Sequence, residues 1–333
     1  MRPGRLAIAA AVLAGVAALA VWRGPIWSRV GEAFTAVRWE WIAAALLFNL
    51  VSIVVRVVAW TTVIDQAMPP PHPRFRSIFS AFSIGLLGNA ALPGRIGELA
   101  RVAVLANRLP RRRGLWATLS GTVFAHRVFD LIVVVGLVLY VLVGTAIPGW
   151  LETSLILLLA FAGGAVVASL VLARRHQVSD LDDGAGRLRL LVTMARHGLG
   201  VMHAPLPAAA AIASQALGWT FQFFAVYAAL RAFQIDEPFV VAGVVLLVMN
   251  VATILPLWPG NVGLMQAAVA LALVPYGIAY AHGFGFGLGL QAIEASVGIG
   301  LGLLFLAREG LSFASLRRGM PEVPHADGAG VSG

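Results

Sequence analysis

The sequence predicts an all-α polytopic membrane protein with about six full spans and two re-entrant or short helical hairpins in an inverted-repeat arrangement. Composition is the first reason, because 59% of the 333 residues are hydrophobic, only 12% are charged and the mean hydropathy is +0.87. Such values exclude soluble globular and disordered chains. The second reason is a series of long apolar runs. The third is a Pro-Gly break, PGRIG at 93–97, that recurs in outline as PGNVG at 259–263.

The apolar runs are long enough to cross a bilayer, which takes about 20 helical residues. They cover 6–22, 41–64, 114–143, 151–173, 206–230 and 283–307. The first run follows Arg2 and Arg5 and has the pattern of a signal peptide, but the spans behind it favour an uncleaved signal anchor. Residues 24–40 alternate apolar and charged positions at helical spacing, which predicts one amphipathic helix lying on the outer face.

Two further apolar regions are interrupted by the Pro-Gly breaks. Ser77–Leu92 offers 16 residues, about 24 Å of helix, before the first break, and a short helix follows from Ile96. Phe239–Leu257 precedes the second break, and a helix from Val262 follows it. The break residues are Pro93, Gly94, Gly97, Pro259, Gly260 and Gly263. Corresponding breaks in two halves of a membrane chain point to a transporter binding site, and a pair of ordinary helix turns is the alternative.

Arginine placement predicts the orientation. All 24 basic residues are arginine, and the net charge is +9. With the N-terminus in the cytoplasm and each hairpin entering and leaving on one side, 16 arginines lie on cytoplasmic segments and four on outer segments. This is the positive-inside pattern, so both termini are expected in the cytoplasm and the two hairpins enter from opposite faces. The arginine excess then indicates attraction to anionic inner-leaflet lipid, with no need for nucleic acid.

The chain is expected to form a single transmembrane domain over residues 1–308. Residues 309–333 are rich in Pro, Gly, Asp and Ser and predict a short, disordered cytoplasmic tail. The polar segment 174–204 is expected to be a flexible cytoplasmic connector. Association with a second copy or with another membrane protein is compatible with this organisation.

Seven ionisable groups fall at membrane depth, where an unpaired charge is costly, so they are expected to face the interior. They are Arg56, Arg95, Glu98, Arg101, Arg127, Asp130 and Glu294. Glu98 and Arg101 are three residues apart, as are Arg127 and Asp130, which places opposite charges on one helix face. Structural ion pairs between helices and a functional polar site both explain such pairs.

The first hairpin carries the stronger functional signal. Arg95 stands beside the free amides of a helix N-terminus, a combination suited to phosphate. On the last predicted span, Gln291 and Glu294 are three residues apart, and both are expected to face the second hairpin. There is no cysteine, no pair of metal-binding histidines on one helix and no phosphate-binding glycine loop with lysine. We therefore expect no metal, no cofactor and no enzyme activity.

Three motifs resemble a known family. LPGRIGELAR at 92–101, HRVFD at 126–130 and WPGNVGLMQ at 258–266 are similar to the transmembrane region of bacterial lysylphosphatidylglycerol synthase/flippases and their stand-alone flippase-like relatives. The resemblance runs from the first span to about Arg308 and implicates the break residues together with Glu98, Arg101, Arg127 and Asp130. His126 and Gln266 stand where the family usually has Glu, which implies that substrate or coupling ion differs. With no synthase domain after residue 308, aminoacyl transfer is not expected.

The leading hypothesis is a lipid flippase that moves phospho- or glycolipid between leaflets of the cytoplasmic membrane. Its expected substrate-binding residues are Arg95, Glu98, Arg101, Arg127, Asp130, Asn261 and Gln266. An alternative is a membrane-embedded accessory subunit or enzyme of lipid or polyprenyl-linked glycan metabolism, with Glu98 as base. A third reading is an assembly factor whose arginine loops dock a partner.

Overall fold

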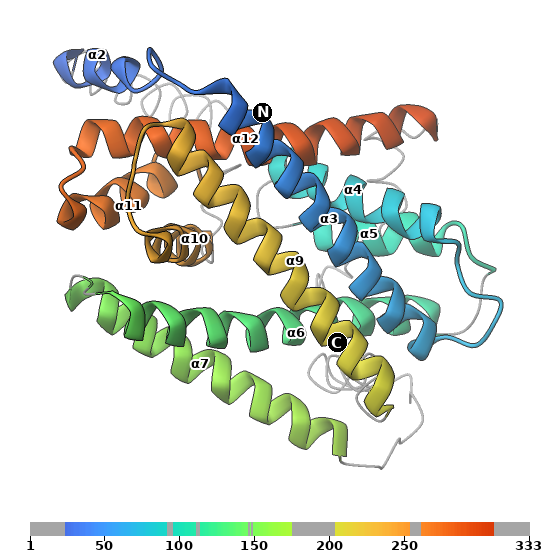
Figure 1. Ribbon diagram of the computed structural model, residues 1–333. Coiled ribbons are helices and arrows are strands. Elements are labelled where there is room, and N and C mark those ends of the chain that lie inside the picture. Colours follow the sequence, from blue (N-terminus) through green and yellow to red (C-terminus); the bar gives the residue numbers. More distant parts are fainter. Residues whose placement is uncertain are drawn as a thin grey trace, which may run out of the picture.

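The computed structural model describes residues 24–91, 96–110, 114–145, 147, 149–174, 204–253 and 261–309, and within these ranges every regular element is a helix (Figure 1). The predicted first span, 6–22, lies outside the described residues, as do the connector over 175–203 and the tail after residue 309. So do Pro93, Gly94, Arg95, Pro259 and Gly260 of the two breaks.

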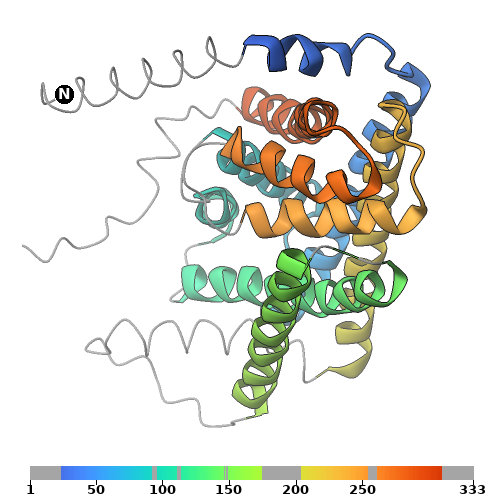
Figure 2. The ribbon, with the colours of Figure 1, turned by 90° about the vertical axis from the view of Figure 1, so that its left-hand side faces the viewer.

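Five of the described helices are long and apolar enough to cross a membrane. They are α3 (Trp39–Ala67), α6 (Leu115–Gly144), α7 (Gly149–Arg174), α9 (Pro205–Ala232) and α12 (Tyr280–Arg308). Each corresponds to one of the apolar runs, so the all-helical polytopic fold predicted from the sequence is confirmed. Helix α7 packs along α6 at the periphery of the bundle (Figure 2).

Two pairs of short helices occupy the positions of the predicted hairpins. The first pair is α4 (Phe75–Ala91) with α5 (Gly97–Ala106), and the second is α10 (Phe239–Ala252) with α11 (Leu264–Leu273). The members of each pair pack on each other. In the first pair the backbones touch, since a Cβ added to Gly97 would lie 2.0 Å from the carbonyl oxygen of Gly85. A glycine is therefore required at position 97 of the first motif.

The order of the elements repeats. A long helix, a short pair and another long helix occur as α3, α4, α5 and α6, with 29, 17, 10 and 30 residues. The same order returns as α9, α10, α11 and α12, with 28, 14, 10 and 29 residues. Helices α3 and α9 begin at residues 39 and 205, which are 166 positions apart. The two halves of the chain are thus built on one plan.

Helices α3 and α9 lie side by side and run in opposite directions (Figure 1). The amide of Arg38, just before α3, donates to the carbonyl of Ala232 at the end of α9, at 2.9 Å. Further along, the hydroxyl of Ser52 donates to the carbonyl of Gly218 at 2.7 Å. The two numbers of each pair have the same sum, as antiparallel packing requires. The corresponding helices of the two halves are therefore inverted relative to each other, in agreement with the predicted inverted repeat.

Helix α12 packs against both short pairs, and glycines allow the close approach. A Cβ at Gly287 would lie 3.1 Å from the Cα of Gln266 on α11, and one at Gly302 would lie 2.4 Å from the Cβ of Leu87 on α4. Figure 2 shows α12, α11 and α10 stacked in succession. One helix thus holds both pairs at a common interface.

The amphipathic segment before α3 is shorter than predicted. Helix α2 covers Gly24–Glu32, turns follow to residue 36, and α3 begins at Trp39. The single helix predicted over 24–40 was therefore wrong in length. At the end of α2, Val30 and Ala33 are buried where the segment packs closely on Gly285 of α12.

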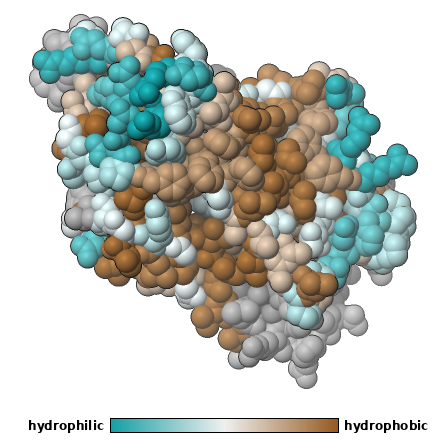
Figure 3. Space-filling view, viewed as in Figure 1, coloured by the Kyte–Doolittle hydropathy of each residue, from teal (hydrophilic) through white to brown (hydrophobic). Residues whose placement is uncertain are grey.

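Hydrophobic side chains cover the middle of the surface in Figure 3, and hydrophilic ones gather at the upper left and at the right-hand edge. Exposed large apolar residues such as Leu157, Phe161 and Val167 lie on the peripheral α7. In water, so much exposed apolar surface would drive association, whereas lipid accommodates it. The surface therefore fits a bilayer environment.

We expect Gly302→Ala to destabilise the protein and Gly300→Ala to leave it unchanged. The methyl at residue 302 would meet Leu87 and also the carbonyl of Ser83 at 2.8 Å, whereas nothing lies within 4 Å at Gly300. Overpacking of this kind costs about 1–3 kcal/mol. Thermal unfolding of the detergent-solubilised proteins, followed by loss of the monodisperse elution peak, measures the difference. Equal stability of the two variants would contradict the tight packing of α12 on α4.

Candidate functional site

A cavity of about 560 Å³ lies between the two short pairs. Its wall is formed by α3, α4, α9, α10 and α12, by residues 261–265 at the start of the last short helix, and by Arg127 of α6. Much of the wall is apolar, with contributions from Ile53, Phe82, Leu86, Leu246, Met249, Met265 and Ile299. Both halves of the chain contribute to this wall, but of the described break residues neither Gly97 nor Gly263 lines it, so a binding site at the two breaks stays a prediction.

The charged side chains at the cavity come from the middles of the long helices. Glu294 is residue 15 of the 29 in α12, Arg127 is residue 13 of the 30 in α6, and Arg56 is residue 18 of the 29 in α3. In a helix that spans the bilayer, such positions lie near the midplane. Substrate sites of transporters with inverted repeats lie at this depth.

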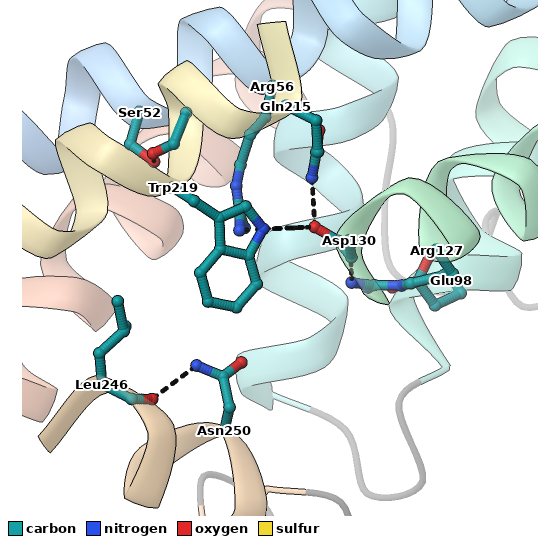
Figure 4. A network of polar contacts seen from close by, with 10 residues as sticks. Ser52, Arg56, Glu98, Arg127, Asp130, Gln215, Trp219, Leu246 and Asn250 are labelled. Atoms are coloured by element: carbon teal, nitrogen blue, oxygen red, sulfur yellow. Dashed lines mark hydrogen bonds and ion pairs between the residues drawn. The ribbon is translucent and has the colours of Figure 1, made fainter. Parts of the chain in front are cut away.

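Five charged residues form a continuous chain of ion pairs, and Figure 4 shows Arg56, Glu98, Arg127 and Asp130 of this chain. Arg101 pairs with Glu98, and Glu98 also contacts Arg127. Arg127 Nη1 lies 3.0 Å from Asp130 Oδ2, and Arg56 Nη2 lies 3.6 Å from Asp130 Oδ1. Both pairs predicted from three-residue spacing are thus formed, and the structure joins them through Glu98 and Arg127. Such pairs could serve as structural links between helices or as a functional polar site, and the structural links are present.

Asp130 receives most of its contacts from other helices. Trp219 Nε1 donates to Oδ1 at 2.8 Å, and Gln215 Nε2 donates to the same oxygen. The guanidinium of Arg56 lies over the Trp219 ring, 4.8 Å from its centroid. These partners compensate the loss of hydration of a carboxylate that is 9% exposed. Asp130 therefore joins α6 to α3 and α9.

Arg101 is buried behind the cavity wall. Its guanidinium lies over two neighbouring aromatic rings, 4.8 Å from the centroid of Trp60 and 5.4 Å from that of Phe82. Arg101 does not line the cavity, and neither do Glu98 and Asp130. Of the residues expected to bind substrate in this cluster, Arg127 alone lines the cavity, with a side chain that is 45% exposed.

His126 does not pair with Asp130, although both lie on α6. The imidazole is buried and meets Phe82 edge-on, with ring centroids 6.2 Å apart. At this position of the second motif, the side chain therefore packs against an aromatic ring and does not extend the ion-pair chain.

The second short pair contributes one expected residue to the cavity. Asn261 lines it, and its side-chain amide donates to the carbonyl of Ala252 at 3.0 Å. Gln266 lies behind the wall: it accepts from the amide of Gly263 at 2.6 Å and contacts Gln291 on α12. Gly263 has a φ of +95°, a conformation that favours glycine. Gln266 thus supports the second break and fastens it to α12.

Several cavity residues escaped prediction from the sequence. Gln222 Nε2 donates to Glu294 Oε1 at 2.6 Å and so bonds α9 to α12. Glu294 and Gln291 were both expected to face the second short pair, and the hydrogen bond described to that pair comes from Gln291. Asn49 and Asn89 also line the cavity. The offset between the two Pro-Gly motifs could have identified Gln222, because Gln222 lies the same 166 positions after the charged residue Arg56.

We expect Asp130→Asn to destabilise the protein more than the double variant Arg56→Gln/Asp130→Asn. The single change leaves Arg56 buried without its carboxylate, which costs several kcal/mol, whereas the double change removes both charges. The coupling energy from the complete cycle is expected to be about 1–3 kcal/mol. Thermal unfolding of the four detergent-solubilised proteins measures it. Additive effects would contradict a direct Arg56–Asp130 pair.

Comparison with known proteins places the chain in a family. Residues 6–302 match the model of the family described as "Lysylphosphatidylglycerol synthase TM region". No curated protein and no solved structure matches the chain significantly. The matched range includes all the residues that line the cavity. The chain therefore belongs to the lysylphosphatidylglycerol synthase TM-region family.

Proposed function

We propose that this protein is a flippase that moves phospho- or glycolipid between the leaflets of the cytoplasmic membrane. One observation carries the proposal: a cavity of about 560 Å³ lies between two inverted halves and has charged side chains from the middles of three long helices around it. The membrane-lipid family to which the chain belongs supports the same conclusion.

Donors at the cavity wall suit a phosphate group. Arg56 and Arg127 both line the cavity, and guanidinium groups bind phosphate through paired hydrogen bonds. The Nε of Arg56 and the Nδ2 of Asn49 are buried and have no hydrogen-bond partner among the described residues. Buried donors of this kind are uncommon and call for a partner. In the proposed function, phosphate oxygens of the lipid supply it.

The apolar part of the wall suits the lipid next to its head group. Phe82, Leu86 and Met249 lie on α4 and α10, one from each half of the chain. A polar head group loses its hydration in the hydrocarbon core, and this loss is the main barrier to unassisted crossing. A polar cavity at mid-depth lowers the barrier by replacing water with fixed donors. The acyl chains remain in the bilayer throughout.

Orientation follows from the arginine distribution. With both termini in the cytoplasm, the first short pair enters from the cytoplasmic side and the second from the outer side. Movement of one half against the other about the α3–α9 contact and α12 then opens the cavity to each leaflet in turn.

Reconstituted protein is expected to accelerate the exchange of fluorescent phosphatidylglycerol between leaflets relative to protein-free vesicles. Gly298→Phe should reduce the acceleration at least several-fold. Gly298 lines the cavity, and a Cβ there would meet only Leu86 at 3.6 Å, so the added ring enters the open volume. Gly300→Phe, two residues along α12 with nothing within 4 Å, is the matched control and should retain activity.

Reduction of the fluorophore by a membrane-impermeant agent measures the exchange. The outcome that contradicts the function is a rate equal to that of protein-free vesicles for every lipid class tested, including a glycolipid. Equal rates for the two phenylalanine variants would contradict the cavity as the path.

A further inference from the structure

Each half of the chain places one carboxylate near the middle of its last long helix. Asp130 lies 15 residues after the first residue of α6, and Glu294 lies 14 residues after the first residue of α12, so the two carboxylates have similar depths without being equivalent positions of the repeat. Their partners are equivalent positions, since Arg56 on α3 and Gln222 on α9 are 166 positions apart. Each half thus places one carboxylate against one side chain of its first long helix.

The partners differ in charge, and this is the asymmetry of the site. Asp130 is held by two guanidinium groups, whereas the bond described for Glu294 comes from a neutral amide. A guanidinium only donates and favours an ionised carboxylate. An amide can donate to an ionised carboxylate, and its oxygen can accept from a protonated one. Gln222 therefore fits both protonation states of Glu294.

The balance of charges in the site gives the protonated state of Glu294 a role. Among the described residues, the ion-pair chain contains Arg56, Arg101 and Arg127 with Glu98 and Asp130, which leaves one positive charge in excess. An ionised Glu294 cancels it while the cavity is empty. A singly charged phosphate bound at Arg56 and Arg127 then leaves one negative charge in excess at mid-depth, which is costly. A proton on Glu294 removes that excess.

We propose that Glu294 takes up a proton when a head group with one anionic phosphate enters the cavity and releases it when the head group leaves, so that lipid and proton cross together. This inference rests on the proposed function. The proton comes from water on the loading side and returns to water on the release side. Its carrier is the Glu294 carboxylate, with Gln222 as the positioning residue.

Few other charged groups face Glu294 from the elements that pack on α12. Arg56 comes from α3, and Arg127 of α6 lines the same cavity. The described residues of α11 contain no ionisable group, α9 presents Gln222, and α4 has only Arg76 in its first turn. Arg29 and Glu32 of α2 are on the helix that packs at Gly285, nine residues or about 13 Å along α12.

Proton uptake by full-length protein in detergent tests the inference without transport. In a weakly buffered solution with a pH-sensitive dye, wild-type protein should take up about one proton for each short-chain phosphatidylglycerol bound. Glu294→Gln should bind this lipid with little or no uptake, because its side chain is neutral and keeps the shape that Gln222 contacts. Glu152→Gln, in the exposed first turn of α7, should behave as wild type.

Phosphatidylcholine is the second arm of this experiment. Its ammonium can pair with an ionised Glu294, so binding should cause no proton uptake. Uptake that persists in Glu294→Gln overturns the inference, and so does phosphatidylglycerol binding by wild type without uptake. Failure of wild type to bind phosphatidylglycerol overturns it too. Elution profile and thermal unfolding of each variant verify that it is folded.

Proteoliposomes with an imposed pH difference separate this inference from the proposed function. For one proton per lipid, a difference of one pH unit shifts the leaflet ratio of phosphatidylglycerol by up to about tenfold. Wild type and Glu152→Gln should show this shift, and Glu294→Gln should not. Exchange by wild type that ignores the gradient overturns the coupling alone. Absence of exchange for any lipid contradicts the flippase function itself.

Discussion

Burial of Asp130 at the middle of the bundle is the constraint on which the site depends. An ionised carboxylate at this depth is tolerated only with cations and donors around it. Arg127 comes from its own helix, Arg56 from α3, and Gln215 and Trp219 from α9. Through Arg127 the network continues to α5. Four helices are therefore held in register by one charge, and two of them, α3 and α9, are the inverted counterparts on which the halves meet.

Close packing between helices also holds the bundle together. Helix α12 has glycines where it approaches α4 and α11, and the first short pair touches backbone to backbone at Gly85 and Gly97. In lipid, apolar side chains gain little by leaving the solvent, so close packing of small residues supplies much of the attraction between helices.

The two halves share a plan and differ in chemistry. In the first half the carboxylate is paired with Arg56 and Arg127, and it lies behind the cavity wall that these two arginines help to form. In the second half an amide takes the place of the guanidinium, and Glu294 faces the cavity. The same repeat thus supplies one half whose carboxylate is paired with arginine and one half whose carboxylate meets a neutral amide.

Much of the fold could be predicted from the sequence, since helix length, apolar composition and three-residue spacing are local properties. They determined the five described spans, the two short pairs and the ion pairs Glu98–Arg101 and Arg127–Asp130. Only the tertiary structure decided which polar residues reach the cavity. It placed Arg101 and Gln266 behind the wall and brought Gln222 to Glu294, because the rotation of each helix depends on contacts with helices distant in the chain. The sequence by itself therefore determined the membrane-spanning helices and their pairing within each half, and packing between the halves decided the site.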